Sequence, residues 1–199
     1  MPEKRTALIL VGGEAKRSGG QEKYFFTYRG RSFLSYLIEA VSPVVGEIIV
    51  VARDSDQCSR FEDIPGIKTA TDIINGIGPL GGIHAGINSA TGNLLFITAC
   101  DMPCIRSGVV DYLFSVIGEY DAAVPCWERD MFEPLHAVYR KDALKKYIAS
   151  PSSLSLRAMV RGINTHFVPV DDIRAIDPGL ATFTNINDLS DLHSINGFD

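Results

Sequence analysis

The chain has no long apolar run and no excess of positive charge. None of its apolar stretches approaches the ~20 residues that a membrane-spanning helix requires. The polar start, residues 1–5, is followed directly by a predicted strand and not by the apolar region of a signal peptide. We therefore expect a cytoplasmic protein without a membrane partner. The formal net charge of −5 argues against nucleic acid as a partner, because general nucleic-acid binding usually needs a basic face.

Cysteine is scarce, and its spacing lacks the pattern of a metal site. The four cysteines, Cys58, Cys100, Cys104 and Cys126, form no C-x-x-C pair, and the histidines do not group beside them. Buried free thiols are the favoured interpretation, with a zinc site as the alternative. No Ser/His/Asp arrangement and no cysteine with a paired base is recognisable, so the sequence does not support covalent catalysis.

Two common phosphate-binding patterns are also absent, although a glycine-rich loop follows the first apolar run. A dinucleotide-binding G-x-G-x-x-G pattern fails at its second glycine after Val11. No Walker-type G-x-x-x-x-G-K-[ST] string occurs. These absences exclude a Rossmann dinucleotide site and a kinase-type site at this loop.

The loop itself has the composition of an anion site. Residues 8–23, LILVGGEAKRSGGQEK, run from an apolar strand into a segment with four glycines and three cations. Glycine lets the backbone approach an anion closely, so that successive N–H groups can point at phosphate oxygens. Lys16, Arg17 and Lys23 would add charge-assisted hydrogen bonds. A triphosphate fits this loop, and an ordinary glycine-rich surface turn is the alternative.

Strand and helix patterns alternate along the chain, whose 199 residues and 46% hydrophobic content are typical of one globular domain, residues 1–199. The predicted strands are residues 7–11, 47–51, 68–72, 93–98, 122–125, 134–139 and 166–170, and the predicted helices are residues 32–41, 80–90, 108–117, 141–149, 153–161 and 187–193. Ser32 fits the N-cap of the first helix. The alternation predicts an α/β fold with a mostly parallel, Rossmann-like sheet and helices on both faces.

Polar and glycine-rich segments stand at the ends of the first four predicted strands. The loop that begins at Gly12 follows the first strand, and Arg53 comes shortly after the second. Asp72 ends the third strand, and Asp101 comes shortly after the fourth. Ligands of open α/β sheets bind outside the carboxyl ends of the strands, so we expect these segments to share one edge of the sheet.

Two aspartates at this edge are candidate ligands. Asp101 lies in TACDMP, and Mg²⁺ needs only one or two protein carboxylates beside substrate phosphates. An aspartate that caps the following turn is the alternative. Asp72 precedes INGIGPLGGI and can accept hydrogen bonds from a ribose or a base edge, with loop and cap chemistry as the alternative. His84 and His136 are weaker candidates, because a lone histidine near an apolar run is more often a satisfied, partly buried side chain.

Six segments, in the same order along nearly the whole chain, resemble the motifs of one family. The first loop has the shape L-x-G-G-x-x-x-R-x-G-x-x-x-K, as in nucleotidyltransferases that join a nucleoside monophosphate to an acceptor phosphate. It is followed by GPLGGI, CDMP, EPLHAVY, SLRAMV and FTNINDL. Together these segments are similar to those of the molybdenum cofactor guanylyltransferase family, the MobA-type enzymes. The resemblance implies a nucleotidyltransferase fold of the nucleotide-diphospho-sugar transferase, or GT-A-like, kind.

The resemblance also implies a reaction and its small molecules. It implies transfer of GMP from GTP to the phosphate of molybdenum-molybdopterin, with release of pyrophosphate and with Mg²⁺ as cofactor. Transient contact with molybdoenzymes or their chaperones is a further expectation. The implied GTP-binding positions are Leu10, Val11, Gly12, Gly13, Arg17, Lys23, Asp72 and Asp101.

Each of these positions has an implied role. The backbone from Leu10 to Gly12 would hold the guanine side of GTP, and Asp72 would contact the nucleoside. Arg17 and Lys23 would bind the phosphates, and Asp101 would hold Mg²⁺. The resemblance therefore assigns the catalytic roles to Arg17, Lys23 and Asp101.

The sequence departs from the family pattern at a few positions. Ser18 stands where methionine is usual and Val11 where alanine is usual, while Ala52 and Arg53 stand where the family often has asparagine. One guanine contact is therefore left unassigned. The paired glycines of the first loop favour guanine, since related cytidylyltransferases tend to carry L-A-A-G. The alternatives are a transferase of the same fold that uses CTP or a sugar-1-phosphate acceptor, and a non-catalytic nucleotide-binding or cofactor-carrier protein.

Overall fold

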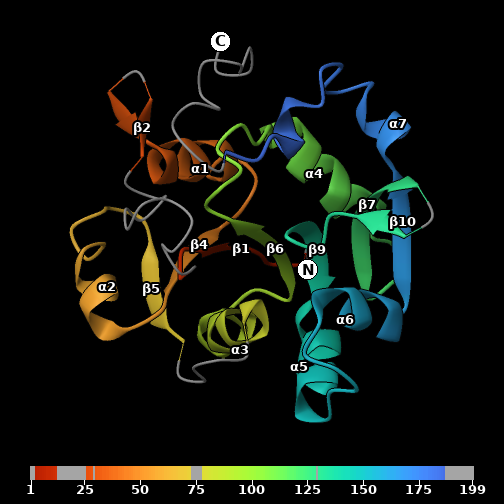
Figure 1. The fold of residues 1–199 in the computed structure, drawn as a ribbon, viewed down its shortest axis with the longest axis horizontal. Coiled ribbons are helices and arrows are strands. Elements are labelled where there is room, and N and C mark those ends of the chain that lie inside the picture. Colours follow the sequence, from red (N-terminus) through yellow and green to blue (C-terminus); the bar gives the residue numbers. More distant parts are fainter. Residues whose placement is uncertain (1–2, 13–25, 29, 73–77, 129, 187–199) are drawn as a thin grey trace.

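An eight-stranded sheet forms the middle layer of the structure, a computed structural model that describes residues 3–12, 26–28, 30–72, 78–128 and 130–186 (Figure 1). Its strands follow the order β10, β7, β9, β6, β1, β4, β5, and β8 pairs with β7. They are β1 (Arg5–Leu10), β4 (Glu47–Ala52), β5 (Lys68–Thr71), β6 (Leu94–Ala99), β7 (Ala122–Glu128), β8 (Met131–Phe132), β9 (His136–Arg140) and β10 (Thr165–Pro169). Within the described part of this sheet, β8 and β9 run against their neighbours and the other strand pairs are parallel, so the predicted mostly parallel sheet is confirmed.

Helices cover both faces of this sheet (Figure 1). One face carries α1 (Phe33–Val41), α4 (Ser107–Val116) and α7 (Val170–Ile173), and the other carries α3 (Pro79–Ser89), α5 (Lys141–Ala149) and α6 (Leu156–Gly162). In β1, Ala7 and Ile9 pack with the first group of helices, and Leu8 packs with the second. Burial on both faces explains the continuous apolar run of this strand. Within the described ranges, no helix has the length and apolarity needed to cross a membrane.

Several elements follow from simple local signals. Ser32 is the N-cap of α1, as predicted, and its hydroxyl accepts a hydrogen bond from Ser35 N at 3.2 Å. The helix predicted at residues 141–149 has those bounds in α5. The strand predicted from Pro134 begins instead at His136, and proline has no N–H to donate to a sheet ladder.

The short elements were not predicted. They are the two-stranded sheet of β2 (Thr27–Tyr28) and β3 (Arg31–Ser32), the strand β8, the helices α2 (Ser55–Ser59) and α7, and the 3₁₀ helix η3 (Ala181–Phe183). Elements of two to five residues are too short for a hydrophobic period to appear. The helix predicted at residues 187–193 lies outside the described residues.

Candidate active site

The carboxyl ends of four adjacent parallel strands form one continuous edge. Cys100 N donates to Leu10 O at 3.1 Å, and Val11 N donates to Val51 O at 3.0 Å. Asp72 N donates to Ala52 O at 2.8 Å. The backbone ladder therefore extends one residue past each strand end, across β6, β1, β4 and β5.

The next residues form a row along this edge. The strand registers place Asp101, Gly12, Arg53 and Asp72 at the same level of the sheet. With neighbouring strands ~4.8 Å apart, Asp101 and Asp72 lie about 14 Å from each other along the row. A single Mg²⁺, which binds oxygens at about 2.1 Å, cannot bridge them. The two aspartates are therefore brought to one edge but in separate places.

The backbone of β1 reaches the edge while its side chains turn inward. Val11 is buried among the residues packed under α1 and α4, and Leu10 contacts the α3 side of the sheet. A Cβ on Gly12 would lie 3.2 Å from Arg53 N and 3.4 Å from its Cα. The chain at Gly12 thus runs close to the end of β4. At this edge the β1 segment therefore presents its backbone, and not its side chains, to a ligand. The Val11 side chain, which is larger than the usual alanine, lies in the core.

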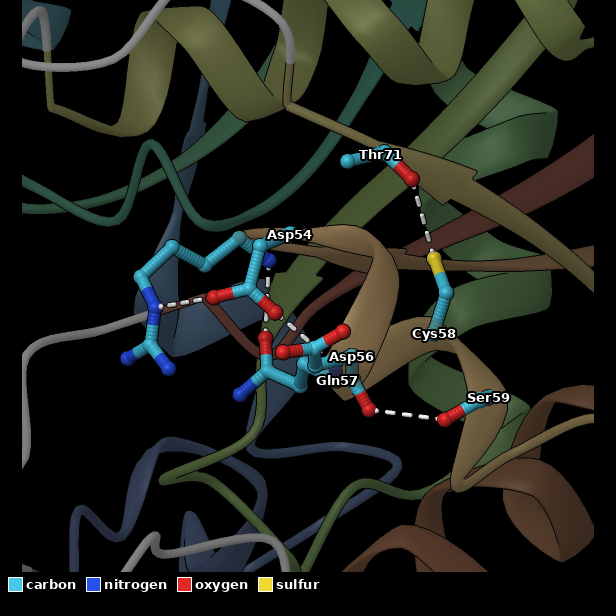
Figure 2. A network of polar contacts seen from close by, with 7 residues as sticks. Asp54, Asp56, Gln57, Cys58, Ser59 and Thr71 are labelled. Atoms are coloured by element: carbon cyan, nitrogen blue, oxygen red, sulfur yellow. Dashed lines mark hydrogen bonds and ion pairs between the residues drawn. The ribbon is translucent and has the colours of Figure 1, made fainter.

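Asp54 and Gln57 form a polar network at the start of α2 (Figure 2), and this network holds Arg53. Its N–H donates to Gln57 Oε1 at 2.7 Å, and its Nε donates to Asp54 Oδ2 at 2.9 Å. Gln57 N in turn donates to Asp54 Oδ1 at 2.8 Å. This backbone hydrogen bond, and then the Arg53 guanidinium, lower the pKa of Asp54. The sequence reasoning missed this network, although an aspartate three residues before Gln57 has the spacing of a helix N-cap.

The cysteines are free thiols. Cys58, Cys100 and Cys104 are buried, as predicted, whereas Cys126 is partly exposed. Cys58 Sγ lies 3.1 Å from Thr71 Oγ1, which joins α2 to the end of β5. Burial raises the pKa of Cys104 to about 11. Across the described part of the chain, no three His, Cys, Asp or Glu side chains group as a metal cage, so the zinc alternative finds no support there.

Asp101 offers this edge an oxygen donor of the kind that Mg²⁺ prefers. Its carboxylate is a hard oxygen donor, and the residue is partly exposed at the end of β6. Its backbone oxygen accepts a hydrogen bond from Ile186 N at 2.8 Å. The segment after η3 therefore contacts the Asp101 turn directly.

A buried polar cluster lies beneath this edge. His136 is fully buried, and its Nε2 lies 3.1 Å from Thr182 Oγ1. Arg106 N donates to the same hydroxyl at 3.2 Å, and Thr182 N donates to Asp177 Oδ2 at 2.8 Å. Burial lowers the pKa of His136 to about 3, so this imidazole is neutral at pH 7.

The two histidines match the sequence interpretation in part, because His84 is partly buried, as expected, and His136 is not. We expected partly buried, satisfied side chains, but His136 is fully buried and its Nδ1 has no hydrogen-bond partner among the described residues. His84 Nε2 lies 3.3 Å from Asn88 Nδ2 on α3, and its Nδ1 is similarly buried. The partners of His136 lie more than 40 residues later in the chain, and no local pattern indicates them.

The structure thus tests the position of only part of the predicted site. It brings Leu10, Val11, Gly12, Asp72 and Asp101 to one edge of the sheet. The predicted phosphate ligands Arg17 and Lys23, together with Gly13, lie outside the described residues. Their roles stay predictions.

A known sequence family matches most of this fold. Residues 7–168 match the MobA-like NTP transferase domain. The chain belongs to the MobA-like NTP transferase family. The match begins in β1 and ends in β10, so the MobA-like domain includes all strands of the central sheet.

Individual proteins support the MobA-like assignment. The chain is 37% identical over 203 residues to a probable molybdenum cofactor guanylyltransferase from Methanosarcina acetivorans, covering 97% of this chain and 90% of that protein. The solved structure of molybdopterin-guanine dinucleotide biosynthesis protein A from Archaeoglobus fulgidus is 27% identical, with a TM-score of 0.78 over 95% of each chain. A 2-C-methyl-D-erythritol 4-phosphate cytidylyltransferase from Thermus thermophilus, 16% identical, shares the fold with a TM-score of 0.65 over 98% of this chain and 97% of that one. The predicted nucleotidyltransferase fold is therefore confirmed.

Proposed function

We propose that this protein is a molybdenum cofactor guanylyltransferase, which transfers GMP from GTP to the phosphate of molybdenum-molybdopterin. The products are the guanine dinucleotide form of the cofactor and pyrophosphate. The observation that carries the proposal is the 37% identity to a probable molybdenum cofactor guanylyltransferase over 97% of this chain. The carboxyl edge of the sheet supplies the matching site.

The order of residues along this edge supports separate binding positions for the nucleoside and the triphosphate of GTP. The backbone from Leu10 to Gly12 holds the guanine side, and Asp72 contacts the nucleoside. Gly12 and Asp72 occupy the part of the row that runs from β1 to β5, while Asp101 stands at its other end on β6. The nucleoside and the triphosphate can therefore occupy different stretches of one edge.

The chemistry needs positioning and charge neutralisation rather than a protein nucleophile. The acceptor phosphate attacks the α-phosphorus of GTP, the bond to the β-phosphate oxygen breaks, and pyrophosphate leaves. Asp101 is the Mg²⁺ ligand, and the bound ion would neutralise charge on phosphate oxygens. Arg17 and Lys23 bind the phosphates and stabilise the charge that gathers on the leaving pyrophosphate.

The setting of the reaction belongs to the same proposal. We expect the chain to act in the cytoplasm as one domain, residues 1–199, on two small molecules. Its product is passed on by transient contact with molybdoenzymes or their chaperones, and neither nucleic acid nor a membrane takes part.

Substitution of Asp101 by asparagine tests the site. Asp101→Asn keeps the size of the side chain and leaves the backbone contact to Ile186 in place, but it removes the negative charge that attracts Mg²⁺. We expect kcat to fall at least about 100-fold, or roughly 2.7 kcal/mol of transition-state stabilisation, with an unchanged thermal midpoint. Pyrophosphate release from GTP, Mg²⁺ and molybdopterin measures the rate. Wild-type turnover in the variant would refute the metal assignment.

A further inference from the structure

Trp127 stands at the same edge of the sheet as the proposed GTP site, on the far side of Asp101. β6 and β7 both run antiparallel to β9, which lies between them, so their carboxyl ends face the same way. Trp127 lies near the carboxyl end of β7, two strand positions from β6. A short segment links the two residues, because Phe183 packs against the Trp127 ring and Ile186, three residues later, donates to Asp101 O at 2.8 Å. Gly12 and Asp72 lie in the opposite direction.

The indole of Trp127 is fixed from two sides. Its Nε1–H donates to Glu133 Oε1 at 2.8 Å, and Glu133 N donates to Pro125 O at 2.9 Å. The ring packs against Phe183 with centroids 5.4 Å apart, and Phe183 packs in turn against His136 at 5.0 Å. The side chain therefore has little rotational freedom left to lose when a ligand binds.

Despite these contacts, Trp127 remains 38% exposed. Two other aromatic residues among the described residues are similarly exposed, but neither lies at this edge. Tyr120 precedes β7 at the opposite edge of the sheet and stacks on His166, and Phe167 lies within β10 against Phe132. A fixed and exposed indole beside a phosphate-transfer site is suited to stacking on a flat heterocycle.

We propose that Trp127 is the stacking platform for the pterin ring of the acceptor. This inference rests on the proposed function, because that function makes the acceptor a pterin that carries a phosphate. The other flat ring in the reaction is guanine, and its proposed contacts lie on the β1 to β5 side of Asp101. A pterin on Trp127 would direct its phosphate toward Asp101 from the side opposite the nucleoside. The attacking phosphate and the leaving pyrophosphate would then lie in different directions from the α-phosphorus.

Steady-state kinetics tests the platform. Trp127→Ala should raise the KM for molybdopterin about 5- to 150-fold, the range for loss of one base–aromatic stack, and should leave the KM for GTP unchanged. Trp127→Phe keeps an aromatic face and should retain most of the affinity. Phe167→Ala removes an exposed aromatic from the neighbouring strand and is the matched control, with wild-type constants expected. Wild-type KM for molybdopterin in Trp127→Ala would overturn the proposal.

Fluorescence gives a readout that does not depend on turnover, because Trp127 is the single tryptophan of the chain. Molybdopterin, added anaerobically, should protect the indole from quenching by acrylamide, and GTP alone should not. If the enzyme transfers GMP but molybdopterin does not protect Trp127 from acrylamide, the stacking role of Trp127 is overturned and the proposed function stands. If wild-type transfer fails, protection by molybdopterin still supports the platform, and its absence overturns it. Protection that grows with protein concentration alone, without ligand, would show that a second copy covers Trp127 and would also overturn the proposal.

Discussion

At the scale of single residues, the backbone at Gly12 lies very close to the end of β4, at the edge where we propose that GTP binds. Gly12 runs so near the end of β4 that an added Cβ would lie 3.2 Å from Arg53 N. Arg53 cannot retreat easily, because its N–H is bonded to Gln57 and its side chain to Asp54. The need for glycine at position 12 is thus a consequence of tertiary packing as well as of the proposed ligand.

Gly12→Ala tests this close approach. The added methyl group must push the β1 and β4 ends apart by a few tenths of an ångström, an overpacking effect of about 1–3 kcal/mol. We expect the free energy of unfolding, measured in urea, to fall by about this amount. Gly46→Ala is the control, because the atom nearest to its added Cβ, Arg5 O, would be 4.0 Å away at the opposite edge. Equal free energies of unfolding in both variants would contradict the close approach of Gly12 to Arg53.

At the scale of elements, hydrophobic periodicity predicts the long strands and helices. The remaining features depend on contacts between residues that lie far apart in the sequence. The apolar run of β1 and the amphipathic pattern of α1 are local, so the sequence predicts them. The contact between Ile186 and Asp101 joins residues 85 positions apart, and no spacing rule indicates it. The same is true of the pairing of His136 with Thr182. The candidate aspartates could therefore be predicted from strand ends, whereas the cluster beneath them could not.

The cluster beneath the edge should make stability depend on pH. Burial lowers the pKa of His136 to about 3 in the folded state, against about 6.5 when unfolded. As the pH falls below about 6.5, the imidazole of His136 binds a proton in the unfolded chain but stays neutral in the folded chain. The contribution of His136 to the free energy of unfolding is therefore fully present above about pH 6.5 and is lost toward pH 3. Between pH 7 and pH 5 this single group should cost about 2 kcal/mol of unfolding free energy.

His136→Gln isolates this contribution, because the amide can still reach the Thr182 hydroxyl and cannot be protonated in this range. Urea unfolding at pH 7 and pH 5 should show a loss of stability about 2 kcal/mol smaller in the variant than in the wild type. Other titrating groups are common to both proteins and cancel in the comparison. The same pH dependence in both would show that His136 does not remain neutral in the folded state.

At the scale of the whole molecule, strand order brings the proposed site residues to one edge of the sheet. β7, β6, β1, β4 and β5 bring Trp127, Asp101, Gly12, Arg53 and Asp72 to that edge in this sequence. The proposed acceptor, metal and nucleoside positions therefore follow the order in which the sheet is built. A chain that alternates strands and helices predicts such an edge, but the placement of β7 beyond the antiparallel β9 appears only in the structure.

Transfer of GMP to a pterin phosphate at this edge can be followed with labelled nucleotides. GTP and CTP, each labelled at the α-phosphate, are incubated separately with the wild-type protein, Mg²⁺ and molybdopterin, and the labelled products are identified by mass. We expect label from GTP in a guanine dinucleotide of molybdopterin, matched by released pyrophosphate, and little or no label from CTP. Transfer from CTP equal to or faster than that from GTP, or no labelled dinucleotide from either nucleotide, would show that the protein is not a guanylyltransferase of molybdopterin.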